Sequence, residues 1–176
     1  MLVGVNIYLR LMEDEDVKYK VKWVNNNEVR KTLNFSYPIS EIGTRKWLNS
    51  VANDSSRRDF IICDLQNDKP IGYIGINNID IKNAKAEYYI GLGDPGYWGR
   101  GLGIEASKLL IHYCFSELNL NKVYLYTWEK NYSMIKLAKR LNFVKEGHLE
   151  DDVLSHGEHR DRIIMSLLKK NYIKED

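Results

Sequence analysis

A glycine-rich turn between an apolar run and a long helical segment constrains this sequence most. The turn reads Gly99-Arg100-Gly101-Leu102-Gly103, after a tyrosine-rich apolar run at residues 86–92. Residues 104–118 then have the apolar content of a long buried helix. A strand, a glycine turn and a helix start can point several backbone N–H groups at one anion, and the helix dipole adds partial positive charge. The sequence therefore predicts a phosphate or pyrophosphate site at this turn.

Length and composition indicate an ordinary globular protein. A chain of 176 residues predicts a single domain, residues 1–176, and a net charge of +2 gives no reason to expect a nucleic-acid partner. No run reaches the roughly 18 apolar residues of a membrane helix, so no membrane partner is expected. Cys63 and Cys114 lie in apolar runs outside any zinc-binding spacing, which favours a reducing, cytoplasmic setting.

The hydrophobic periodicity predicts a mixed α/β fold with the element order β-α-α-β-β-β-α-β-α-β-β. Strands are expected at residues 3–12, 59–65, 71–79, 86–92, 122–128, 143–148 and 160–168. Helices are expected at residues 17–24, from the N-cap Ser40 to residue 51, at 104–118 and at 131–141. On the first two helices, we expect Trp23 and Trp47 to pack in the core, and Lys18, Lys20 and Lys22 to be solvated.

One alternative is a dinucleotide-binding protein. Gly101-x-Gly103-x-x-Ala106 fits that fingerprint, and Glu129 ends the next strand, near where an acidic ribose ligand would stand. Against this, residues 93–98 separate the strand from the glycines, and residues 1–85 precede a motif that normally begins a βαβ series. A glycine turn with a purely structural role is a further alternative.

A known family matches more of the chain. Residues 86–106 resemble motif A of the GNAT acyltransferases, and residues 131–147 resemble their motif B. The resemblance covers nearly the whole chain and is strongest to the ribosomal-protein and polyamine N-acetyltransferases. It implies the GNAT fold, a central twisted mixed sheet flanked by helices and splayed, at a bulge, where acetyl-CoA binds. It also implies transfer of an acetyl group from acetyl-CoA to a primary amine by direct attack, without a metal.

The resemblance also implies which residues bind acetyl-CoA. In the family, backbone amides of the glycine loop hold the pyrophosphate, and an open strand edge pairs with the pantetheine arm. Asn131 matches the family's asparagine that contacts pantetheine, and it is also a candidate helix N-cap. By position, the acetyl-CoA residues are Ile90, Gly91, Leu92, Trp98, Gly99, Arg100, Gly101, Leu102, Gly103 and Asn131.

Two residues are candidates for catalysis. Glu87, on the strand that leads into the splay, is the leading candidate for the base that deprotonates the amine, although a strand carboxylate can equally be a solvated residue. Ala138 occupies the position where many family members have a tyrosine that protonates the leaving thiolate. Ser133, matched to the serine of the Asn-x-x-Ser motif in the resembling branch, is the candidate to hydrogen-bond the sulfur. Its alternative is a helix-surface serine.

The sequence says less about the amine that accepts the acetyl group. Phe35 and Tyr37, in an aromatic loop, are candidates for its pocket, with ordinary packing as the alternative, whereas core packing is favoured over the pocket for Trp23 and Trp47. The loop at residues 34–38 has no carboxylate, which lowers the polyamine option without removing it, since Glu28 and Glu41 lie on either side. A small-molecule or peptide amine is therefore expected, and a homodimer is left open. A different class of function, suggested by the missing tyrosine, is an acyl-CoA-binding module that has lost catalysis.

Overall fold

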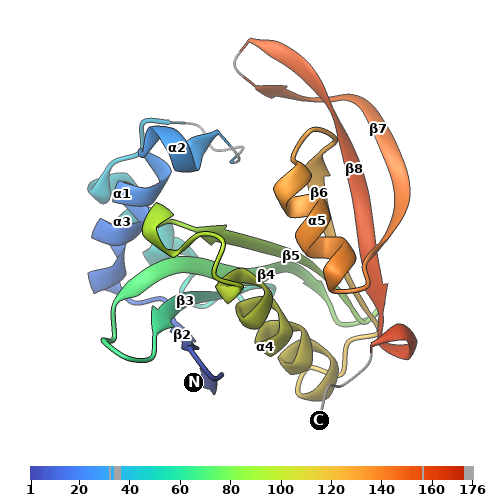
Figure 1. The fold of residues 1–176 in the computed structure, drawn as a ribbon, viewed down its shortest axis with the longest axis horizontal. Coiled ribbons are helices and arrows are strands. Elements are labelled where there is room, and N and C mark those ends of the chain that lie inside the picture. The colour runs from blue at the N-terminus through green and yellow to red at the C-terminus, as the bar shows by residue number, and fades with distance from the viewer. Residues whose placement is uncertain (32, 34–36, 156, 173–176) are drawn as a thin grey trace.

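The computed structural model describes residues 1–31, 33, 37–155 and 157–172 (Figure 1). The strands are β1 (Leu2–Val3), β2 (Ile7–Leu11), β3 (Arg58–Asp64), β4 (Pro70–Asp80), β5 (Lys85–Leu92), β6 (Lys122–Trp128), β7 (Val144–Ser155) and β8 (Glu158–Leu168). The α-helices are α1 (Val17–Val24), α2 (Asn27–Arg30), α3 (Glu41–Val51), α4 (Leu102–Ser116) and α5 (Tyr132–Arg140). This order confirms the predicted mixed α/β fold. Within the described ranges, no helix is long and apolar enough to cross a membrane.

The strands form one sheet in the order β1-β2-β3-β4-β5-β6-β8-β7, antiparallel except between β5 and β6. The parallel pairing begins at Lys85↔Lys122 and ends at Glu87↔Tyr124, although both strands continue beyond it. β6 remains paired with β8 as far as Trp128↔Arg162. The two halves of the sheet therefore diverge after Glu87, as Figure 1 shows, and the predicted splay lies between β5 and β6.

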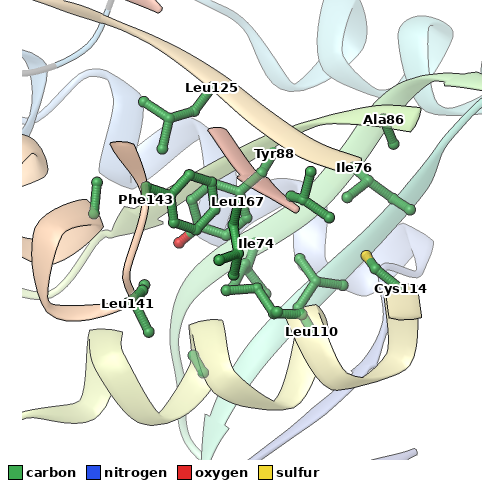
Figure 2. Close-up of a cluster of buried hydrophobic side chains, with 14 of the residues drawn as sticks. Ile74, Ile76, Ala86, Tyr88, Leu110, Cys114, Leu125, Leu141, Phe143 and Leu167 are labelled. Carbon is green, nitrogen blue, oxygen red and sulfur yellow. The ribbon is translucent and has the colours of Figure 1, made fainter. Parts of the chain in front are cut away.

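Two hydrophobic clusters fix the helices on opposite faces of the sheet. The larger cluster joins α4 and α5 to one face, and Figure 2 shows Leu110 and Cys114 of α4 against Ile74 and Tyr88. The smaller cluster joins α1 and the edge of α3 to the other face. Alternation along β5 follows from these clusters, since Tyr88 belongs to the α4 face and Tyr89 to the α1 face.

The structure adds a short helix, α2, that the sequence did not predict, and it departs from the predicted strands in two places. The strand expected at residues 3–12 is divided, because the Glu105 carboxylate accepts the N–H groups of Val5 and Asn6 at 2.7 Å each and holds a turn there. The closing strands β7 and β8 run further than predicted and form a long hairpin that extends past α5 (Figure 1). The outer half of this hairpin is polar, so its sequence lacks the alternation that would have predicted strands.

Candidate active site

A cavity of about 810 Å³ opens where β5 and β6 diverge. Its walls come from α1 and α3 on one side, from β3, β4 and β5 at the base, and from β6 and β8 on the other side. This volume is in the range of small-molecule sites. The sheet thus places a ligand-sized cavity beside the open edge of β5.

Glu87 lines this cavity, and it is the last residue of β5 that pairs with β6. Its Oε2 accepts a hydrogen bond of 2.9 Å from Asn78 Nδ2. Burial is the largest cause that raises the pKa of Tyr124, and the negative charge of Glu87 adds to it. Asn78 has φ +50° at a register irregularity of β4, a conformation that asparagine tolerates. The register irregularity therefore lies in β4, on the side of β5 away from the splay. It presents the Asn78 side chain as a donor to Glu87.

The open edge of β5 has defined backbone groups. The N–H of Gly93 donates to the carbonyl of Ile71 at 2.9 Å, so by the alternation of an antiparallel ladder Gly91 also faces β4, while Ile90 and Leu92 face the opening. The carbonyl of Leu92 accepts from Trp98 Nε1 at 2.9 Å, which ties the glycine turn to the strand. Of the predicted pantetheine-pairing residues, Ile90 and Leu92 are those whose backbone is turned to the opening.

The glycine turn has open space above it. Gly99 and Gly101 have φ +77° and +80°, and a Cβ at either would meet no atom within 4 Å. The backbone conformation, rather than crowding in this structure, requires glycine at both positions. α4 then begins at Leu102, and the first N–H groups of a helix have no partner within it. A Cβ at Gly103 would lie 3.3 Å from Leu137 Cδ1, because α4 starts close to α5.

α5 places Asn131 at the cavity but Ser133 outside it. Asn131 lines the cavity and caps α5, with its Oδ1 accepting the N–H of Met134 at 3.2 Å. Ser133 is exposed and is not among the described lining residues. The match of Ser133 to the Asn-x-x-Ser motif is also wrong, because it follows Asn131 by two positions and Met134 holds the third. Ala138 is fully buried in the core.

Tyr37, the predicted acceptor residue that the structure describes, does not line the cavity. Tyr37 is 48% exposed, its ring lies 4.0 Å from the guanidinium carbon of Arg30, and it does not belong to the described lining. Phe35 lies outside the described residues. Trp23 is buried as predicted, whereas Trp47 both packs against the smaller cluster, as favoured, and lines the cavity, which was the alternative.

Lys20 is the residue that sequence reasoning misplaced most. It is 8% exposed and lines the cavity, while Lys18 and Lys22 are exposed as predicted. Its Nζ lies 3.6 Å from the centroid of the Trp47 ring, and burial lowers its pKa to about 8. Helical spacing could have revealed this position, because Lys20 follows Val17 by three residues and precedes Val24 by four, and both valines are buried.

An ion pair and a tyrosine network lie beside Lys20. Asp59 accepts two hydrogen bonds from Arg57, at 2.7 and 2.8 Å, and a third from the Tyr89 hydroxyl. Burial acts to raise the pKa of Asp59, but the bonds from Arg57 and Tyr89 outweigh it and hold that pKa below its ordinary value. The hydroxyl of Tyr73 is buried and has no hydrogen-bond partner among the described residues.

Glu129, His148 and Asp161 form a separate cluster of potential metal ligands. Their ligand atoms lie within 4.8 Å of one another, and His148 Nε2 lies 2.8 Å from Asp161 Oδ2. The cluster is mostly exposed and lies outside the described cavity lining. It is a hydrogen-bonded cluster at the β7–β8 side of the sheet, and no step of the predicted chemistry uses it.

Comparison with known proteins identifies the fold. The family model described as "Acetyltransferase (GNAT) domain" matches residues 6–144. The chain belongs to the GNAT acetyltransferase family. This membership overturns the dinucleotide alternative and confirms an enzyme that uses acetyl-CoA to acetylate an amine.

Several relatives of this GNAT chain cover nearly its full length. It is 35% identical over 168 residues to the "Uncharacterized N-acetyltransferase p20" of Bacillus licheniformis, covering 93% of each protein. It is 30% identical over 172 residues to the spermidine N(1)-acetyltransferase of Escherichia coli K12, covering 97% of this chain and 90% of the relative. The crystal structure of the Vibrio cholerae spermidine N-acetyltransferase with CoA and spermine superimposes with a TM-score of 0.89 at 25% identity, covering 96% and 99% of the two chains.

Proposed function

We propose that this GNAT enzyme acetylates a small primary amine that enters the cavity at the β5–β6 opening, with Glu87 as the base. The observation that carries the proposal is that the parallel pairing ends at Glu87, where the cavity begins. The donor edge and the acceptor cavity thus meet at this carboxylate. The relatives named for spermidine make a small amine a reasonable acceptor class.

The donor site is built mainly from backbone. Acetyl-CoA supplies the acetyl group as an activated thioester. The backbone groups of Ile90 and the N–H of Leu92 fit its pantetheine arm, and the N–H groups at residues 99–103, with open space over Gly99 and Gly101, fit its pyrophosphate. The Arg100 side chain can add charge to a phosphate. Asn131 uses Oδ1 as a cap, which leaves Nδ2 as a donor for the pantetheine arm.

Glu87 supplies the proton acceptor that direct attack requires. An alkylammonium has a pKa of about 10, so the amine must lose a proton to Glu87, directly or through a water, before it can attack. The hydrogen bond from Asn78 fixes the carboxylate at the cavity wall. The N–H groups of Ile90 and Leu92 are turned to the opening, where they can polarise the thioester carbonyl.

The leaving thiolate needs little help from the protein. A thiol has a pKa of about 8.5, so its anion is a stable leaving group near neutral pH and can take a proton from water. The buried Ala138 offers no donor, and the exposed Ser133 has no place in this proposal. Positioning of the two substrates by the cavity and the β5 edge then supplies much of the rate.

Thiol release from acetyl-CoA with a panel of primary amines tests the function. We expect Glu87→Gln to lower kcat/KM by about 100-fold near neutral pH, because removal of a general base typically costs about that much. Calorimetry should show unchanged acetyl-CoA binding by the same variant. Glu117→Gln, at an exposed carboxylate directly after α4, is the matched control.

Two outcomes would overturn parts of this proposal. Acetyl-CoA binding without thiol release for any amine would leave only a binding module. Full activity of Glu87→Gln would remove the base assignment and leave the donor site intact.

We also propose that residues 1–176 act as one domain in the cytoplasm. The sheet takes strands from both ends of the chain. Cys63 and Cys114 are buried free thiols, as is usual for proteins of a reducing compartment.

A further inference from the structure

Two buried hydrogen-bond donors line the cavity side by side without acceptors. Lys20 is 8% exposed and Tyr73 is 5% exposed, and the Nζ of Lys20 lies 5.7 Å from the Tyr73 ring. Within the described part of the chain, neither the ammonium nor the hydroxyl has a hydrogen-bond acceptor. Buried polar groups in folded proteins are nearly always hydrogen-bonded, so a pair of orphaned donors in a cavity indicates a ligand that accepts from both.

The other charges of the cavity are already compensated at this end. Asp59 is neutralised by the bidentate bond from Arg57, and Arg162, on the opposite wall, pairs with Asp152. Within the described chain, no ion pair balances the charge of Lys20. At the β5–β6 end, the Glu87 carboxylate accepts from Asn78 and likewise has no ion-pair partner among the described residues. The cavity is therefore positive where α1 covers it and negative where the sheet splays.

The sheet gives the distance between these two ends. Tyr73 and Asn77 both face the cavity from β4, four residues apart, which is about 13 Å along a strand. Asn77 is the β4 partner of Glu87, whereas Lys20 lies over Tyr73. A molecule that spans both ends needs its two recognised groups roughly 10 Å apart, given that both side chains lean into the cavity.

We propose that the acceptor is an amine that also carries an anionic carboxylate or phosphate group, bound by Lys20 and Tyr73 while the amine lies at Glu87. This inference rests on the proposed function, since it names the acceptor class of the same cavity. The anion accepts from the ammonium and the hydroxyl, and the Trp47 ring shields one side of the ion pair. A second ammonium group at this position, as in a linear polyamine, meets Lys20 instead and is repelled.

Acceptors that share one carbon chain and differ only at the far end provide the test. Aminooctanoate, octylamine and diaminooctane present a carboxylate, a methyl group and an ammonium at matched length, and aminooctyl phosphate separates phosphate from carboxylate recognition. We expect kcat/KM to fall in the order anionic, neutral, cationic. An equal or reversed order overturns the inference, whereas absence of transfer to every amine overturns the proposed function instead.

Variants of Lys20 assign the preference to this side chain. We expect Lys20→Met to reduce kcat/KM for aminooctanoate by on the order of ten- to a hundred-fold, mainly through KM, because a hydrogen bond to a charged group is lost. The same variant should lower kcat/KM for octylamine much less than for aminooctanoate, and Lys20→Arg should retain most of the preference. Lys22→Met, an exposed lysine of the same helix, is the control. An unchanged preference in Lys20→Met contradicts the inference.

The pH profile separates a charge effect from a change of shape. The groups that face Lys20 are Trp47 on α3, Tyr73 on β4, and the pair of Asp59 on β3 with Arg57 just before that strand. Burial lowers the pKa of Lys20 to about 8, so its positive charge is lost above that pH. The ratio of kcat/KM for aminooctanoate to that for octylamine should therefore fall as pH rises through about 8, because the amine of both acceptors titrates alike. A flat ratio contradicts the inference.

Discussion

Replacement of Lys20 by methionine should make the folded protein more stable. Burial lowers the pKa of Lys20 from 10.5 to about 8, which corresponds to roughly 3 kcal/mol against the charged form in the folded state. The Trp47 ring, whose centroid lies 3.6 Å from the ammonium, offsets about 1–2 kcal/mol of this cost through a cation–π contact. Methionine fills a similar volume and packs well on aromatic rings, so we expect Lys20→Met to raise the free energy of unfolding by about 1–2 kcal/mol near pH 7.

The sign of the pH dependence follows from the same pKa. Because the pKa of Lys20 is lower in the folded state, the unfolded chain holds more protons between pH 8 and 10.5, and the stability of the unsubstituted protein rises with pH there. The advantage of Lys20→Met should therefore be full below about pH 8 and fade as pH approaches 10.5. Urea unfolding at several pH values, with equal m values for both proteins, measures this difference.

The control and the refuting result are both specific. Lys22→Met removes an exposed charge from the same helix and should change stability by less than about 0.5 kcal/mol. If Lys20→Met lowers stability near pH 7, or if its effect is the same on both sides of pH 8, then an uncompensated buried ammonium is the wrong description of this site.

Three further perturbations test other parts of the structure. Glu105→Ala should lower the free energy of unfolding by about 1 kcal/mol in thermal melts, because the exposed turn at Val5 and Asn6 loses its acceptor. Burial acts to raise the pKa of Glu105, but the hydrogen bonds from Asn6 outweigh it and hold that pKa below its ordinary value. The stability that Glu105 contributes should therefore be lost as pH falls below about 4.5. Asp16→Asn should cost about 3 kcal/mol in denaturant unfolding, since it leaves Arg10 without its bidentate partner. Gly101→Ala should cost only about 1–2 kcal/mol of strain at φ +80° yet weaken acetyl-CoA binding more than ten-fold by calorimetry, and equal binding would contradict the assigned pyrophosphate site.

Most of the fold could be predicted because its elements have strong local patterns. The strand at residues 122–128 has the predicted bounds, and α4 follows the glycine turn as expected. The helix α2 was missed because four residues carry no periodicity, although Asn26 caps it by accepting the N–H of Glu28. A side chain from α4, Glu105, divides the first strand, and no pattern within residues 3–12 contains that information.

The site was predictable on one side only. Glu87, Ile90 and Asn131 belong to two continuous motifs and line one cavity, and Trp98 ties the glycine turn to Leu92 of the same strand. The acceptor wall is assembled from α1, α3, β3 and β4, whose cavity-facing residues are far apart in sequence. Trp47 and Lys20 acquire their place only when those elements meet, so residue type alone assigned one to the core and the other to solvent.

This division fits a donor site that depends on the fold and an acceptor site that depends on individual side chains. In the proposed donor site, acetyl-CoA binds largely to backbone groups, and the fold superimposes on that of a solved relative at 25% identity. The acceptor meets side chains, and one lysine on α1 is enough to reverse the charge that a cavity presents. The two Lys20→Met outcomes decide between roles for this residue. A structural lysine would lower stability when removed, whereas a lysine retained for an anionic acceptor raises stability when removed and loses the acceptor preference in the same variant.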